Sequence, residues 1–209
     1  KPITQTTLAM ILHFHLYRGE DERKSMADCL AKIIHENGDR MNTGFVGTPY
    51  LLHALSENGY TDLAYTLLLQ EKMPSWLYSV NHGATTMWER WNCINEDGSF
   101  SSVSMTSFNH YAYGAVADWL YGVCAGVNSL EDGAGYKHIS LAPNPSKELG
   151  FVNCRIKTVS GEVVSNWYYS GEFIHYEFTV PAGTVAELTL PDGRKETLCG
   201  GEYIFTTKA

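Results

Sequence analysis

Residues 83–91 read Gly83-Ala84-Thr85-Thr86-Met87-Trp88-Glu89-Arg90-Trp91, so one carboxylate lies between two indoles and beside a guanidinium. Broad aromatic faces stack against the C–H face of a sugar ring, and a carboxylate among them can accept or donate a proton. The stretch therefore indicates a carbohydrate site with Glu89 as its acid or base. An equally simple interpretation makes the indoles part of the core and leaves Glu89 on a solvated face.

A second aromatic cluster surrounds a histidine later in the chain, at Ser107-Phe108-Asn109-His110-Tyr111-Ala112-Tyr113-Gly114. Two such clusters in one chain favour a shared binding site over two unrelated core segments. Trp76, in a segment predicted to be a long loop, could add a sugar-stacking platform or simply anchor that loop.

Composition excludes several classes of protein. The 209 residues are 44% apolar and 18% charged, as in ordinary soluble proteins, with an excess of aromatic residues that fits both carbohydrate contact and a tightly packed barrel. The net charge is −8 and no basic run exceeds Arg194-Lys195, so we expect no nucleic-acid partner. Apolar runs fall short of the ~18 residues of a membrane span.

The five cysteines predict neither a zinc site nor a disulfide framework, because they are odd in number, widely spaced and without a CxxC pair. We expect no metal and no cofactor. Free thiols mildly favour a reducing compartment, and hence the cytoplasm over the periplasm. The chain begins at Lys1 without a signal-peptide pattern, so we expect a piece of a longer protein whose targeting segment, if any, lies upstream.

Apolar spacing predicts about six helices in the first part of the chain. They are expected before Gly19, up to Asn37-Gly38, from Thr48-Pro49 to Asn58-Gly59, from Thr61 to Pro74, from Thr85 or Thr86, and from Asn109 to Gly126. Short connections within pairs imply antiparallel neighbours. The longer connections, 38–47 and 74–87, are typical of functional loops.

From Tyr136 onward the pattern changes to a period of two, as in Ile174, Tyr176, Phe178 and Val180. Turn residues such as Ser170-Gly171 and Asp192-Gly193 interrupt it. We therefore predict residues 131–209 to be an antiparallel β-sandwich of six to eight short strands, following a helical domain over residues 1–130.

Three segments in this order, Thr43-Gly44-Phe45-Val46-Gly47-Thr48-Pro49-Tyr50-Leu51-Leu52, residues 83–91 and residues 107–114, resemble the C-terminal part of the α-L-rhamnosidases of glycoside hydrolase family 78. The resemblance implies part of an (α/α)6 barrel followed by a β-sandwich. It also implies hydrolysis of terminal α-L-rhamnose with inversion, on a rhamnose-containing glycoside or oligosaccharide.

The resemblance further implies that Glu89 is the general base and that His110 lies in the sugar pocket, where we also expect Trp76, Trp88 and Trp91. An inverting enzyme needs two carboxyl groups roughly 6.5–9.5 Å apart, one to protonate the leaving oxygen and one to activate water. The family carries its acid in an acidic, Arg-containing motif N-terminal to this region.

Asp21-Glu22-Arg23 echoes that acidic motif, but its surroundings do not match, and acidic residues in a first turn are explained by the helix dipole. We therefore expect the acid upstream and the fragment alone to be inactive. The six helices are about half the number that six helical hairpins require, so exposed helix faces could drive self-association.

Two alternatives stay open at this point. Another (α/α)6 carbohydrate-active enzyme acting on a different terminal sugar would share these features, and a substrate panel separates it. A non-catalytic carbohydrate-binding or structural module would bind rhamnose without hydrolysing it.

Overall fold

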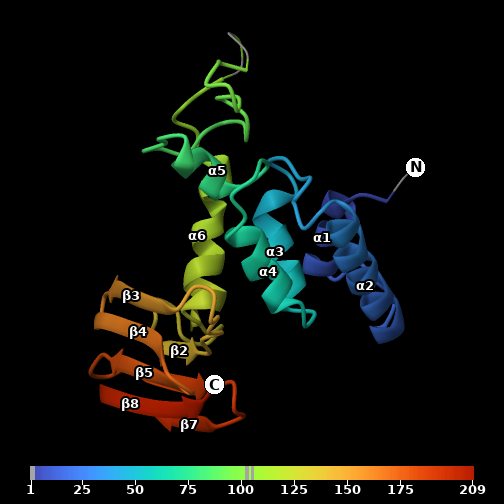
Figure 1. The fold of residues 1–209 in the computed structure, drawn as a ribbon. Coiled ribbons are helices and arrows are strands. Elements are labelled where there is room, and N and C mark those ends of the chain that lie inside the picture. Colours follow the sequence, from blue (N-terminus) through green and yellow to red (C-terminus); the bar gives the residue numbers. More distant parts are fainter. Residues whose placement is uncertain (1–2, 102–103, 105) are drawn as a thin grey trace. The chain divides into compact units, whose positions relative to one another are not determined.

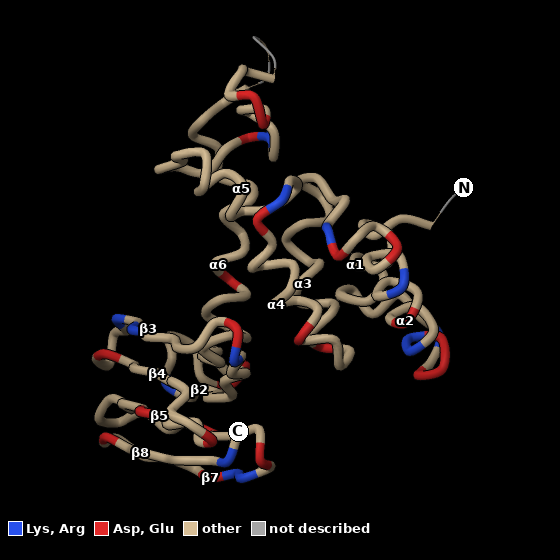
Figure 2. The backbone as a smooth tube through the Cα atoms, in the orientation of Figure 1, with Lys and Arg blue, Asp and Glu red and all other residues tan. Residues whose placement is uncertain are grey.

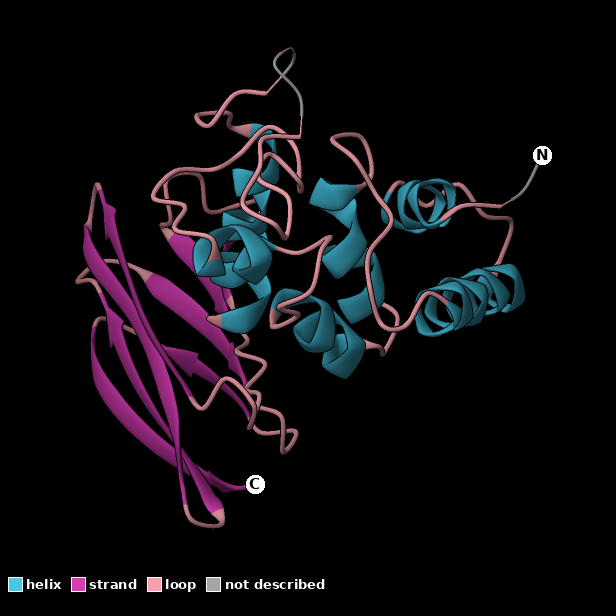
Figure 3. Cartoon of the chain, turned by 45° about the horizontal axis from the view of Figure 1, so that its top comes forward, coloured by secondary structure: helices cyan, strands magenta, loops and turns pink. Residues whose placement is uncertain are grey.

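The computed structural model describes residues 3–101, 104 and 106–209. It divides into two compact units, Lys1–Val116 and Ala117–Ala209. Helices and long loops make up the first unit and strands dominate the second, as the cyan and magenta segments of Figure 3 show. Lys and Arg are scattered along both units between acidic residues (Figure 2). Among the described helices, none is long and apolar enough to cross a membrane.

The first unit is built from successive helical hairpins (Figure 1). Its helices are α1 Gln5–His13, α2 Glu20–Glu36, α3 Thr48–Ser56, α4 Thr61–Leu68 and α5 Trp76–Asn81. Helix α1 packs on both α2 and α3, and α3 packs on α4. One buried leucine stripe joins them, since Leu12, Leu30, Leu51 and Leu67 are all 1% exposed or less. The paired helices thus follow the predicted apolar spacing.

Helix α5 differs from the sequence-based expectation. The helix predicted to start at Thr85 or Thr86 does not form, and residues 84–92 are bends, turns and irregular chain. A helix forms instead within the predicted loop, where the Ser75 hydroxyl accepts a hydrogen bond from the N–H of Tyr78 and caps the first turn. Six residues are too few to show a helical period, so only this cap could have indicated α5.

A single helix was predicted from Asn109 to Gly126, and the segment that forms there changes its winding. A 3-10 turn at Ala112–Ala115 leads into α6, Val116–Trp119, and then into a π turn at Leu120–Cys124. The division between the two units falls inside this segment. The apolar stripe predicts a helix but not these changes of hydrogen-bond spacing.

The second unit holds two four-stranded sheets. One has the order β1-β2-β6-β7 and the other the order β3-β4-β5-β8. The strands are β1 Val127–Ser129, β2 His138–Leu141, β3 Phe151–Thr158, β4 Gly161–Ser170, β5 Phe173–Val180, β6 Val185–Thr189, β7 Lys195–Leu198 and β8 Gly201–Lys208. All pairings are antiparallel except β2 with β6, which are parallel.

Two side chains of strand β4 donate hydrogen bonds to carbonyls at the end of the preceding helical segment. The indole N–H of Trp167 donates to the carbonyl of Cys124 at 2.9 Å, and the Ser165 hydroxyl donates to the carbonyl of Ala125 at 2.6 Å. Trp167 and Ser165 are both fully buried. Carbonyls at a helix end lack partners within the helix, so these two bonds remove the cost of burying them.

His138, at the start of β2, bridges two acidic side chains. Its Nδ1 lies 2.8 Å from Asp132 in the preceding turn, and its Nε2 lies 3.3 Å from Glu187 on β6. The ring therefore ties the connection before β2 to the parallel strand beside it.

Gly126 follows the helical segment with a φ of 73° and lies against the backbone of the chain after β2. A Cβ at this position would come within 2.1 Å of the carbonyl carbon of Ala142 and 2.2 Å of the nitrogen of Pro143. The carbonyl of Gly126 cannot move away freely, because it accepts the N–H of Ala142 at 2.8 Å. Only glycine fits this crossing without displacing backbone.

We predict that Gly126→Ala lowers the free energy of unfolding by about 1–3 kcal/mol more than Gly183→Ala. Gly183 has a φ of 77° with open space around its Cβ position, so it shares the left-handed strain but not the clash. Urea denaturation of both variants, followed by far-UV circular dichroism, measures the difference. Equal losses would show that the close contact with the backbone of Ala142 and Pro143 does not contribute to the free energy of unfolding.

Candidate active site

The two aromatic motifs lie side by side in the first unit. The N–H of His110 donates to the carbonyl of Met87 at 2.8 Å, and the N–H of Glu89 donates to the carbonyl of Ser107 at 2.9 Å. The hydroxyl of Thr86 donates to the carbonyl of Phe108. Residues 86–89 and 107–110 therefore form a short ladder of mostly main-chain bonds, which brings the carboxylate and the histidine into one region.

The carboxylate of Glu89 is held by the same partner residue. Its Oε2 accepts the N–H of Ser107 at 2.8 Å, and the side chain is half-buried. In the part of the chain that the structure describes, Glu89 and Arg90 form no ion pair. Glu89 is thus a partly shielded carboxylate with a neutral donor on one oxygen.

His110 lies in a stack of aromatic rings. The Phe45 ring is 4.7 Å from it at an interplanar angle of 9°, and the Tyr111 ring is 5.2 Å away at 13°. The Nδ1 atom accepts the N–H of Ala112 at 3.3 Å. With Nδ1 acting as an acceptor, Nε2 is the ring nitrogen that can donate a hydrogen bond.

Trp91 and Trp76 form the second half of the aromatic cluster. Trp91 stacks on Tyr113 with ring centroids 3.7 Å apart, and Trp76 meets Trp91 edge-on at 5.4 Å. Phe45 contacts Tyr113 at 5.2 Å and so joins this group to the His110 stack. Burial raises the pKa of the Tyr113 hydroxyl, an effect that the nearby Arg90 charge opposes.

Both indole N–H groups of this cluster donate to main-chain carbonyls. Trp76 donates to Tyr113 at 2.9 Å, and Trp91 donates to Thr43 at 3.1 Å. The second bond fastens the segment before α3, where Gly47 approaches α1 so closely that a Cβ would lie 2.5 Å from the Thr6 hydroxyl. All three motif segments are thereby held together.

Trp88 points to a different neighbour. It is 4% exposed and meets Phe108 edge-on at 5.4 Å. Trp76 is also nearly buried, at 8%. Trp91 and His110 are half-buried. The structure thus brings Glu89, His110, Trp76 and Trp91 into one region, and Trp88 packs on Phe108 instead of joining the other rings.

Three residues of this region were not singled out as site residues from the sequence. Phe45 and Tyr113 carry the ring stacks, and Ser107 holds Glu89 through its main chain. The first two lie inside the quoted motifs, and that position was their only signal. A main-chain donor has no signature in the sequence.

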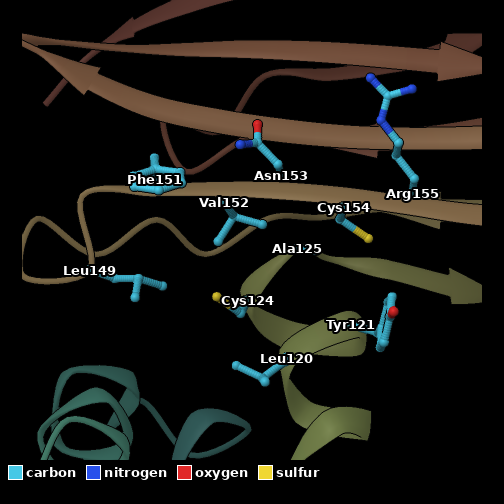
Figure 4. Close-up of a pocket in the computed structure, with 10 residues that line it drawn as sticks. All are labelled: Leu120, Tyr121, Cys124, Ala125, Leu149, Phe151, Val152, Asn153, Cys154 and Arg155. Atoms are coloured by element: carbon cyan, nitrogen blue, oxygen red, sulfur yellow. The ribbon is translucent and has the colours of Figure 1, made fainter.

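The second unit contains a separate cavity of about 570 Å³ (Figure 4). Leu120, Leu149 and Val152 line it together with the thiols Cys124 and Cys154. Its described lining includes no carboxylate, and the charged member, Arg155, pairs with Glu162 at 3.1 Å. Burial raises the pKa of the Cys154 thiol, which keeps it protonated and unreactive. The lining of this cavity therefore offers no carboxylate for the hydrolysis of a glycoside.

Over residues 3–101, 104 and 106–209, no group of three or more His, Cys, Asp and Glu side chains is arranged to hold a metal ion.

Two family models together match most of the chain. Residues 1–124 match the bacterial α-L-rhamnosidase six-hairpin glycosidase domain, and residues 126–205 match the bacterial α-L-rhamnosidase C-terminal domain. A curated α-L-rhamnosidase of Formosa agariphila is 42% identical over 97% of this chain. That alignment covers 22% of the relative, so the chain spans about a fifth of its length.

Solved structures of α-L-rhamnosidases are similar to the chain in fold. The native α-L-rhamnosidase of Aspergillus terreus is similar with a TM-score of 0.93 and 36% identity, over 97% of this chain and 24% of that one. The α-L-rhamnosidase of Streptomyces avermitilis, complexed with L-rhamnose, gives a TM-score of 0.92 and 34% identity, over 98% and 21%. The predicted fold class, part of an (α/α)6 barrel followed by a β-sandwich, is confirmed.

The Tyr113 ring, rather than its hydroxyl, should stabilise this cluster. We predict that Tyr113→Phe changes the free energy of unfolding by less than about 0.5 kcal/mol, because the stacks on Trp91 and Phe45 remain. Tyr113→Leu should cost about 2–4 kcal/mol through lost stacking and volume. Chemical denaturation of both variants measures this, and equal losses would assign the stabilisation to the hydroxyl.

Proposed function

Because the chain belongs to the bacterial α-L-rhamnosidase family, we propose that it is part of a glycoside hydrolase that releases terminal α-L-rhamnose with inversion, with Glu89 as general base. The observation that carries this proposal is the position of Glu89. Its carboxylate is bonded to the N–H of Ser107, and Trp91, two residues further along, is bonded to Thr43, so the segment that carries Glu89 contacts both of the other motif segments. The ring-rich surroundings suit a sugar, and the carboxylate suits proton abstraction from water.

In the proposed reaction Glu89 removes a proton from a water molecule while the water oxygen attacks the anomeric carbon. The bond from that carbon to the leaving oxygen breaks, and a general acid gives the leaving oxygen its proton. The base and the acid act on opposite faces of the sugar, which inverts the configuration. The neutral N–H of Ser107 bonds to one oxygen of the Glu89 carboxylate, and the other oxygen takes up the water proton in this proposal.

We propose sugar contacts for the neighbouring rings. The Nε2 atom of His110 is free to donate to a rhamnose hydroxyl, since Nδ1 already accepts from the backbone. Trp91 is half-buried and offers part of its surface to an apolar sugar face. Trp76 and Trp88 are nearly buried, so in this proposal they present at most an edge to the sugar and support the wall behind it.

The general acid is proposed to lie in a part of the protein outside this chain. The chain corresponds to about a fifth of its curated relatives, at 22% and 18% of their lengths for the two at 40% identity or above. Among the described residues, Glu89 is the carboxylate that bonds to the main chain of the His110 motif, and no second carboxylate is bonded beside it. On this proposal the 209 residues alone hold a base without its acid.

The test is Glu89→Gln in the whole protein, assayed on an aryl α-L-rhamnoside. Glutamine retains an oxygen that can accept the Ser107 N–H but cannot take up the water proton. We predict a fall in kcat of at least ~10²-fold with unchanged thermal stability. Turnover at the wild-type level would remove Glu89 from the role of base.

The matched control is Glu96→Gln, which neutralises an exposed carboxylate in the same connection between the two motifs. It should leave kcat within about twofold of wild type, as surface changes away from reacting groups usually do. Polarimetry or NMR of the first-formed sugar anomer tests inversion separately. The isolated chain, assayed in parallel, should release no rhamnose.

A further inference from the structure

We propose that Ser107 is the positioning residue for Glu89 and that it acts through its main chain alone. Its N–H fixes one oxygen of the carboxylate so that the other oxygen faces the attacking water. The inference rests on the proposed role of Glu89 as general base and adds the group that orients its carboxylate.

Ser107 holds Glu89 at two points. Its N–H donates to Oε2 of Glu89 at 2.8 Å, and its carbonyl accepts the main-chain N–H of the same residue at 2.9 Å. The backbone and the side-chain end of Glu89 are thereby tied to one residue, eighteen positions away in the chain. A flexible glutamate side chain bound at both ends loses most of its rotamer freedom.

The two oxygens of the carboxylate are left in different states. Among the described residues, the Ser107 N–H is the group that bonds to Oε2, and no protein donor bonds to Oε1. A general base needs lone pairs that are not already used by the protein. The arrangement therefore leaves Oε1 for the water proton while Oε2 sets its direction.

Ser107 is itself held in place. Its carbonyl also lies 3.7 Å from the thiol of Cys93, which is fully buried and donates to it. The residues that follow Ser107 are also bonded to the 86–89 segment, since the His110 N–H donates to Met87 and the Thr86 hydroxyl donates to Phe108. The N–H that contacts Glu89 thus belongs to a residue whose own carbonyl and whose following residues 108 and 110 are all hydrogen-bonded.

The Ser107 side chain is engaged elsewhere. Its hydroxyl accepts the N–H of Asn109 at 3.1 Å and does not contact Glu89. This separates the two parts of the residue experimentally. Removing the hydroxyl should leave the base in place, whereas removing the N–H should release it.

The comparison is Ser107→Pro against Ser107→Ala in the whole protein. Proline lacks the N–H, and alanine keeps it. A displacement of a reacting group by about 1 Å can cost ~10²-fold in rate. We expect Ser107→Pro to lower kcat about 10- to 100-fold with KM within about twofold, and Ser107→Ala to retain wild-type kcat and KM. A merely structural role would not separate kcat from KM in this way.

Steady-state kinetics on an aryl α-L-rhamnoside, with Glu89→Gln measured alongside, gives a decision in each case. Wild-type kcat in Ser107→Pro, while Glu89→Gln is inactive, overturns the positioning role but not the base. An equal loss in Ser107→Ala and Ser107→Pro also overturns it. Full turnover of Glu89→Gln is the failure of the proposed function itself.

If circular dichroism shows that Ser107→Pro does not fold, a backbone ester at position 107 replaces it. The α-hydroxy analogue of serine removes only the N–H and keeps both the side chain and the chain direction. The same fall in kcat with unchanged KM is expected from the ester, and wild-type kcat in a folded ester variant contradicts the proposal.

Discussion

The first unit depends on a short ladder between two segments that are far apart in the sequence. Residues 86–89 and 107–110 meet mostly through main-chain bonds, and closing the loop between them costs conformational entropy. The stacked rings supply the compensating stabilisation. Trp91 on Tyr113 and Phe45 on His110 bury aromatic surface. Two indole N–H groups also donate to main-chain carbonyls that would otherwise lack a hydrogen-bond partner.

The regular elements could be predicted from the sequence because their physical cause is periodic. The apolar stripe of α2 ends at Asn37-Gly38 as expected, and α3 begins at Thr48-Pro49. The change to a period of two marks the strands of both sheets. In the same way, the residue types around Glu89 and His110 indicated a carbohydrate site, and the structure brings these two segments together. Their roles in catalysis remain proposals.

The remaining features have no periodic signal. Helix α5 is shorter than two turns, so its cap at Ser75 carried the information that its apolar residues could not. The parallel pairing of β2 with β6 is invisible to alternation, which is the same in both directions. The contact of Ser107 with Glu89 uses a main-chain N–H that almost every residue type possesses. Sequence reasoning therefore singled out Glu89, the proposed base, and missed the main-chain N–H that bonds to its carboxylate.

The bridge that His138 makes in the second unit couples folding to proton uptake. Hydrogen bonds to Asp132 and then to Glu187 raise the pKa of the imidazole above its ordinary value of 6.5. A raised pKa in the folded state means that the stabilising contribution is complete below that ordinary value and is lost as pH rises through the folded one. The ring is partly exposed, so solvent weakens the effect. The contribution of this one bridge to stability is therefore largest in mildly acidic solution and decreases as the pH rises.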